Sequence, residues 1–232
     1  MLAILEYLFG NPGGLIAWQL LAATRFTIYL SIIAFLGGGL LAGVICFLRM
    51  YPFELAKRIA IFYIWLFQST PLLMLLFLIG LGVPRLIGIE INPWLAATIA
   101  LCLFTSAYLA EVWRGAIGSV PVGQWEAARS LGLSFRQIFF KIIIPQAFRL
   151  ALGPTIGFLV QIVKGTSLAY IIGFSDLMLL GKRWANSPVP DSEPFIIFPA
   201  MALIYFGLCY PLSRLGLRLE KRHNESAMSK GK

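Results

Sequence analysis

The sequence predicts an all-α polytopic membrane protein of about five transmembrane helices. Hydrophobic residues occupy 59% of the 232 positions and charged residues only 12%, whereas ordinary soluble domains carry about 25% charged residues. A bilayer core is crossed by roughly 20 apolar residues. Four stretches of at least that length contain no charged residue, and they lie between Arg25 and Arg49, Arg58 and Arg85, Glu90 and Glu111, and Glu193 and Arg214.

A fifth span is predicted between Lys141 and Asp176, where Arg149 and Lys164 interrupt an otherwise apolar run. Prolines within or beside the spans are expected to kink them, because each removes a backbone donor. These prolines are Pro71, Pro145, Pro154, Pro199 and Pro211. In chain order, the helices are expected near residues 24–48, 59–82, 94–113, 142–164 and 195–217.

These spans imply a simple domain organisation. Residues 1–23 form an N-terminal interfacial segment, with a short interfacial helix expected in 1–9. Residues 24–220 form the transmembrane domain, and residues 221–232 form a polar tail.

The net charge of +9 is distributed along the chain in a way that indicates orientation. If the N-terminus lies outside, the inside segments 49–58, 114–149 and 214–232 collect most of the 19 Lys and Arg residues. The positive-inside rule therefore predicts an N-out, C-in topology. Asp176 and the pair Lys182–Arg183 are then expected to be solvated on the outer side.

Several other functions find little support in the sequence. There is one His, and the carboxylates are scattered at span ends, which disfavours a membrane enzyme. The string Lys164-Gly165-Thr166-Ser167 lacks the spacing of a phosphate-binding loop, so ATP hydrolysis by this chain is not expected. All the cysteines lie in apolar stretches and suggest neither a disulfide framework nor a metal site; they are Cys46, Cys102 and Cys209.

The inside loop 114–141 has the composition of surface helices, because it is neither apolar enough to span nor polar enough to be disordered. Gly132 suits the left-handed conformation at a helix end, and Ser134 with Gln137 fits a capping box. We therefore predict two short helices joined by a turn, an elbow that extends over residues 119–145.

The elbow has features of a docking surface. Ala127 and Ala128 would form a small face that allows close approach of another protein, and Glu126 and Arg129 would supply orienting charges at its edge. From the residues alone, an amphipathic connector that rests on lipid headgroups is equally compatible with the pattern.

The chain resembles the inner-membrane permeases of ATP-binding-cassette importers in the pattern of this elbow. Their shared signature is Glu-Ala-Ala, three residues, Gly, nine residues, Ile, one residue and Leu-Pro. The matching positions, with Ile in place of Leu, are Glu126-Ala127-Ala128, Gly132, Ile142 and Ile144-Pro145.

Resemblance to the polar amino acid branch of that family extends from about residue 20 to about residue 220. Gln68 stands where relatives commonly carry Arg, and Gly165 stands where they often carry an acidic residue. The strings that carry the resemblance are Phe67-Gln68-Ser69-Thr70-Pro71-Leu72, Ala110-Glu111-Val112-Trp113-Arg114-Gly115, Pro145-Gln146-Ala147-Phe148-Arg149 and Lys164-Gly165-Thr166-Ser167-Leu168.

The resemblance implies a permease subunit that moves a polar L-amino acid into the cytoplasm of a bacterium by alternating access. It implies a multi-pass protein of the cytoplasmic (inner) membrane, and as partners a second permease subunit, alike or different, two cytoplasmic ATP-binding subunits, and a periplasmic or extracellular substrate-binding protein. ATP and Mg would be bound by the ATPase subunits, and no cofactor by this chain. The residues expected to couple the chain to the ATPase are Glu126, Ala127, Ala128, Arg129 and Gly132.

Polar residues inside the spans are the candidates for the translocation path, because a charge within a bilayer is costly unless it faces a cavity or a partner. Lys164 is the first candidate, and a lysine that snorkels to the headgroups is the equal alternative. The absence of a clear acid near it favours an acidic or neutral substrate over a cationic one. The other candidates, for which helix packing or capping is the alternative, are Gln68, Ser69, Thr70, Pro71, Thr166 and Ser167.

An ion channel or secondary transporter without an ATPase partner is the alternative function. Polar, proline-kinked spans suit either class, but such a protein has no need of the elbow. Glu111 and Arg114, at the inside end of the third span, are expected to pair with each other or with the elbow.

Overall fold

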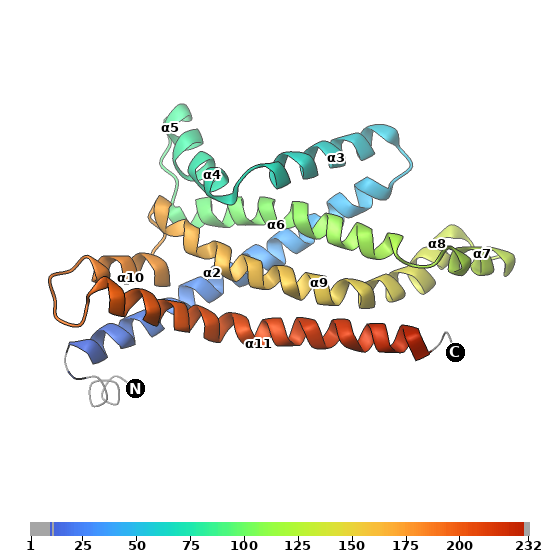
Figure 1. Cartoon of the computed structure of the whole chain (residues 1–232). Coiled ribbons are helices and arrows are strands. Elements are labelled where there is room, and N and C mark those ends of the chain that lie inside the picture. The colour runs from blue at the N-terminus through green and yellow to red at the C-terminus, as the bar shows by residue number, and fades with distance from the viewer. Residues whose placement is uncertain (1–9, 11, 230–232) are drawn as a thin grey trace.

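The computed structural model describes residue 10 and residues 12–229, which fold into a bundle of helices (Figure 1). Among these described residues, four helices are long and apolar enough to cross a membrane, and a bent helix pair supplies a fifth candidate span. The predicted all-α fold with about five spans is confirmed. The elements are α2 (Gly13–Met50), α3 (Glu54–Ser69), α4 (Leu72–Phe77), the π-helical η1 (Leu78–Gly82), α5 (Val83–Ile87), α6 (Pro93–Gly118), α7 (Val122–Ser130), α8 (Phe135–Ile138), the π-helical η2 (Phe139–Ile143), α9 (Ile144–Gly165), the 3₁₀-helix η3 (Thr166–Ile172), α10 (Leu177–Ala185) and α11 (Pro194–Ser229).

The most extensive helix–helix contact joins α2 and α6. Small residues recur every four positions along α2, where Ala34, Gly38 and Ala42 are all buried. Without a hydrophobic driving force between helices in lipid, close approach of backbones over small residues is what favours association. At Gly38 the approach is so close that an added Cβ would lie 2.5 Å from the Cβ of Thr105 in α6.

The predicted second span is broken rather than continuous over 59–82. Helix α3 and the α4–α5 segment meet at 101°, with the break at Thr70 and Pro71 (Figure 1). Thr70 is extended, at φ −93° and ψ 124°, because a following proline excludes the helical conformation. Pro71 also lacks the N–H that would continue the helix. The predicted kink is therefore a complete interruption.

Several predicted boundaries are wrong because the helices run past the charges. Helix α2 begins at Gly13 rather than near residue 24, so the first helix extends into the segment that was predicted to be interfacial, and Arg25 lies within this helix. Arg25 is exposed, with its guanidinium carbon 4.7 Å from the centroid of the Phe26 ring. Helix α11 continues through most of the predicted tail to Ser229. The expected interfacial helix in 1–9 lies outside the described residues.

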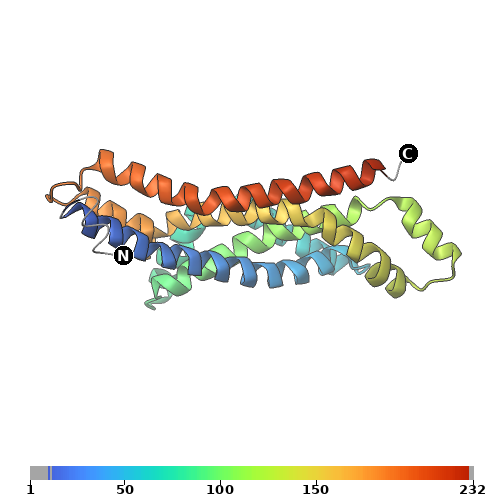
Figure 2. The same ribbon diagram turned by 90° about the horizontal axis from the view of Figure 1, so that it is seen from below.

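The two ends of the bundle differ in what they carry. Helices α7 and α8 project from the end where α11 terminates, and α10 and the start of α2 lie at the opposite end (Figure 2). The predicted fourth span, 142–164, is part of a longer run from Phe135 to Ile172, in which η2 connects α8 to α9. The elbow is therefore continuous with a span.

Candidate functional site

The elbow has the two local structures that its sequence predicts. Gly132 has φ +73°, and its N–H donates to the carbonyl oxygen of Arg129 while Leu133 N–H donates to that of Ala128. This double pattern is the Schellman motif that closes a helix. Ser134 and Gln137 form a reciprocal capping box at the start of α8. Both ends of the turn are therefore fixed by backbone-directed hydrogen bonds.

Helix α7 is held against α8 and the start of α9 by three of its side chains. Ala128 is 2% exposed and packs into the buried cluster around Ile138 and Ala147. The Trp125 ring stacks on Phe135, with centroids 6.1 Å apart. The Gln146 amide donates to the side-chain oxygen of Gln124 at 3.3 Å, a contact that the sequence analysis missed.

Ala128 therefore does not form the outward small face that was predicted for it. Its helical neighbours Glu126, Ala127 and Arg129 are all exposed, and only Ala127 offers a small side chain to a partner. The prediction placed both alanines on one face, but consecutive residues differ by about 100° around a helix. Ala128 contributes by fixing α7 in place.

The outer surface of the elbow, defined by Val122, Glu126, Ala127, Arg129 and Leu131, combines apolar and charged side chains. Val122 is 69% and Leu131 77% exposed. Neither Glu126 nor Arg129 forms an ion pair with another described residue. Exposed apolar groups beside unpaired charges are typical of a surface that binds another protein.

The two groups of path candidates, 68–71 and 164–167, lie in neighbouring elements. Helix α4, which begins directly after Pro71, packs against η3. At the junction, a Cβ added to Gly165 would lie 2.9 Å from Cδ2 of Leu72. The break in the second span therefore faces the end of α9, a proximity that sequence spacing does not show.

Some of the path candidates form hydrogen bonds within the protein, and others have exposed side chains. Gln68 donates its amide to the Ala107 carbonyl at 3.3 Å, which ties α3 to α6. Thr166 is fully buried and donates to the Val163 carbonyl at 2.7 Å. Thr70 and Ser167 similarly donate to the carbonyls of Leu66 and Lys164 within their own helical turns. The path candidates that are exposed are Ser69, Pro71 and Lys164.

An ion cluster connects α2 and α6 near the elbow. Arg114 lies 2.8 Å from one Glu111 oxygen, which confirms the predicted pair. The Nε atom of Arg49 lies 3.5 Å from the other oxygen. Arg49 was missed because it is distant in sequence, although it is the last charged residue of the first span.

Asp176 is buried rather than solvated as predicted. Its carboxylate caps α10 by accepting the Leu179 N–H at 3.0 Å, but Oδ2 has no hydrogen-bond partner among the described residues. Tyr205 of α11 lies beside it. Asp176 lies outside the spans, and burial raises its pKa to about 6. Because a carboxylate between two spans is usually solvated, the packing of α10 between α2 and α11 is what reveals this burial.

Comparison with known proteins gives consistent matches over most of the chain. Residues 36–224 match the family model described as binding-protein-dependent transport system inner membrane component. The chain is 33% identical to the "Probable amino-acid ABC transporter permease protein YckA" of Bacillus subtilis (strain 168), over 94% of this chain and 95% of that protein. It is 35% identical to the "Probable glutamine ABC transporter permease protein GlnP" of the same organism, over 88% of this chain and 92% of that protein.

A solved structure shows the same fold. It is described as an amino acid ABC transporter with histidines, and it superimposes with a TM-score of 0.81 at 30% identity, over 88% of this chain and 93% of that chain.

Proposed function

The chain belongs to the family of binding-protein-dependent transport system inner membrane components, as an amino-acid ABC transporter permease, and from this we propose that it imports a polar L-amino acid by alternating access. In this proposal the chain lies N-out, C-in in a bacterial cytoplasmic membrane. It pairs with a second permease subunit, and it receives substrate from a binding protein at the end that carries α10. Two separate ATP-binding subunits supply the energy.

The observation that carries this proposal is the elbow. Its outer surface is apolar in part, its charges form no ion pair with another described residue, and its turn is closed by caps. The elbow projects at the end of the bundle where α11 terminates (Figure 2). The positive-inside rule assigns this end to the cytoplasm, where an ATPase would be. A channel or secondary transporter has no use for such a projection.

The proposed substrate class is supported by the residues beside the break. Strings 67–72 and 164–168 carry one cation, Lys164, and no carboxylate. Lys164 is exposed, so its ammonium group is available to a carboxylate of the substrate. A cationic side chain would meet repulsion without a compensating acid. An acidic or neutral L-amino acid is therefore the proposed cargo.

Coupling through the elbow is tested by co-purification with the ATPase subunit encoded by the same host. Glu126→Lys reverses a charge on the outer surface of the elbow, and Gly132→Arg strains its turn. Glu54→Lys is the matched control, since Glu54 is exposed on α3 and pairs with Arg58 outside the elbow. We expect both elbow variants to lose the ATPase and the control to retain it, with unchanged circular dichroism. Absence of an ATPase from the unaltered chain would favour the channel or secondary-transporter alternative.

A further inference from the structure

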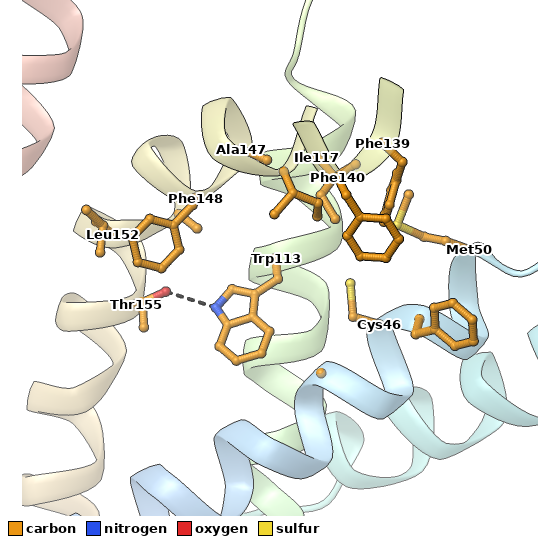
Figure 3. A pocket seen from close by; sticks show the side chains of 14 residues that line it. Cys46, Met50, Trp113, Ile117, Phe139, Phe140, Ala147, Phe148, Leu152 and Thr155 are labelled. Carbon is orange, nitrogen blue, oxygen red and sulfur yellow. Dashed lines mark hydrogen bonds between the residues drawn. The ribbon is translucent and has the colours of Figure 1, made fainter. Parts of the chain in front are cut away.

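A separate pocket of about 430 Å³ lies between the second half of α2, the second half of α6 and the η2–α9 junction. Trp113 lies at its centre, Phe139 and Phe140 on one side, and Phe148 and Leu152 on another (Figure 3). It is distinct from the candidate path. Thr155 is its last lining residue on α9, and Lys164 lies about 14 Å further along that helix.

The lining excludes a polar ligand. It consists of carbon and sulfur apart from backbone atoms, Thr155 and the Trp113 indole. These two polar groups satisfy each other, because the indole N–H donates to the Thr155 hydroxyl at 3.1 Å. A zwitterionic amino acid would lose its hydration here without gaining a partner. The pocket therefore suits an apolar ligand.

Two basic residues of the η2–α9 segment are sequence neighbours of residues that line the pocket. Lys141 directly follows Phe140, and Arg149 directly follows Phe148. Both are exposed, and neither forms an ion pair within the part of the chain that the structure describes. The combination of an apolar hollow and unpaired cations is complementary to an acyl chain with an anionic headgroup.

We propose that this pocket binds one acyl chain of an anionic phospholipid from the cytoplasmic leaflet, with its phosphate held by Lys141 and Arg149. The leaflet assignment rests on the orientation in the proposed function. A second copy of the chain fits less well. Helix partners in membranes approach over small residues, whereas this rim carries Phe47, Phe140 and Phe148, which are 54%, 60% and 63% exposed.

Headgroup charge supplies the selectivity. A lipid tail is as apolar as the pocket, so moving it from the bilayer into the pocket changes its hydrophobic energy little. If the pocket were empty, the side chains that line it would lack dispersion contacts. A flexible acyl chain in the pocket restores these contacts. Each basic side chain near the membrane surface then favours an anionic over a zwitterionic lipid by roughly fivefold.

The test is native mass spectrometry of the full chain in mild detergent, with phosphatidylglycerol or phosphatidylcholine of equal chain length. We expect one phosphatidylglycerol per chain, with phosphatidylcholine bound more weakly. Lys141→Gln and Arg149→Gln should each weaken phosphatidylglycerol binding about fivefold. The control Lys182→Gln removes an exposed cation from α10, at the opposite end, and should leave binding unchanged.

A pocket-filling variant tests the site independently of charge. A Cβ at Gly43 would lie 3.7 Å from the Trp113 ring, so Gly43→Leu introduces bulk without a backbone clash and should reduce retention of both lipids. Equal retention of the two lipids, or no effect of Gly43→Leu, would overturn the proposal. A dimer that retains no lipid would assign the pocket to a second copy. The assay needs neither ATPase nor substrate, so a failure of coupling does not affect its outcome.

Discussion

Replacement of Gly38 by alanine should weaken the central contact of the bundle. The new Cβ would lie 2.5 Å from Cβ and 2.7 Å from Cγ2 of Thr105, and 3.0 Å from the Cys102 carbonyl oxygen. Carbon atoms at optimal contact are about 3.5 to 4.0 Å apart. Helices α2 and α6 would therefore have to separate by about 1 Å, because Thr105 is fully buried and cannot move aside.

The cost can be estimated from two opposing effects. Overpacking of a core costs about 1 to 3 kcal/mol. Replacing a glycine by alanine inside a helix recovers about 0.5 to 1 kcal/mol. The adjacent Gly39 isolates the first effect, because a Cβ there would meet only Trp113 at 3.8 Å and Leu109 at 4.0 Å. Both variants gain the same helix propensity, so their difference reports overpacking alone.

Thermal unfolding of the two variants in detergent measures that difference. For a chain of this size, about 1 to 3 kcal/mol corresponds to about 2 to 12 °C in Tm. We expect Gly39→Ala to unfold at or slightly above the Tm of the unaltered protein, and Gly38→Ala to unfold below Gly39→Ala by that amount. Equal Tm values, or a higher value for Gly38→Ala, would refute the close approach of α2 and α6 at this position.

Three further changes have defined outcomes. The pKa of Asp176 rises from 3.8 to about 6 on folding, so the contribution of this residue to stability should be complete below about pH 4 and fall by up to about 3 kcal/mol as the pH rises through 6; Asp176→Asn keeps the cap and should remove this contribution to the pH dependence of Tm. Glu111→Gln removes the carboxylate shared by Arg49 and Arg114 and should cost about 1 kcal/mol in urea unfolding. Gln124→Ala should speed amide hydrogen exchange in α7 and leave exchange in α6 unchanged.

Sequence patterns that depend on local chemistry predict the structure well. A charge-free stretch of 20 or more residues indicates a span, because each charge is costly in the bilayer core. The turn of the elbow is equally predictable from the sequence, since the left-handed Gly132 and the Ser134–Gln137 capping box involve only neighbouring residues. No tertiary information is needed for either prediction.

Features that depend on distant contacts could not be predicted. Pro71 in the sequence indicates a kink, but a 101° interruption also requires α4 to pack on η3, about one hundred residues later in the chain. The charge pattern likewise placed the start of the first helix near residue 24, whereas α2 begins at Gly13. Arg25 lies on an exposed face of a helix that is about 57 Å long, which is much longer than the bilayer core.

Burial of individual side chains was the least predictable property. Ala127 and Ala128 are identical in type, yet one is exposed and the other belongs to the core, because only Ala128 faces Ile138 and Ala147. Asp176 carries a charge and was expected to be solvated, but α10, which it caps, is covered by α2 and α11. Each outcome is set by how helices are placed in space, which local composition does not encode.

Helix α9 is the element through which the elbow and the candidate path are connected. At one end, the Gln124–Gln146 hydrogen bond and the packing of Ala128 fix α7 to its first turn. At the other end, Gly165 lies against Leu72, directly beside the break at Pro71. A continuous helix is stiff along its axis. A displacement of the elbow must therefore either move the far end of α9, beside this break, or bend α9 at a point where a backbone hydrogen bond is missing. Pro154 inside α9 is one such point, because its missing N–H leaves a carbonyl of the preceding turn unpaired. Under the proposed function, ATPase movements would therefore reach the path as a shift or a bend of α9.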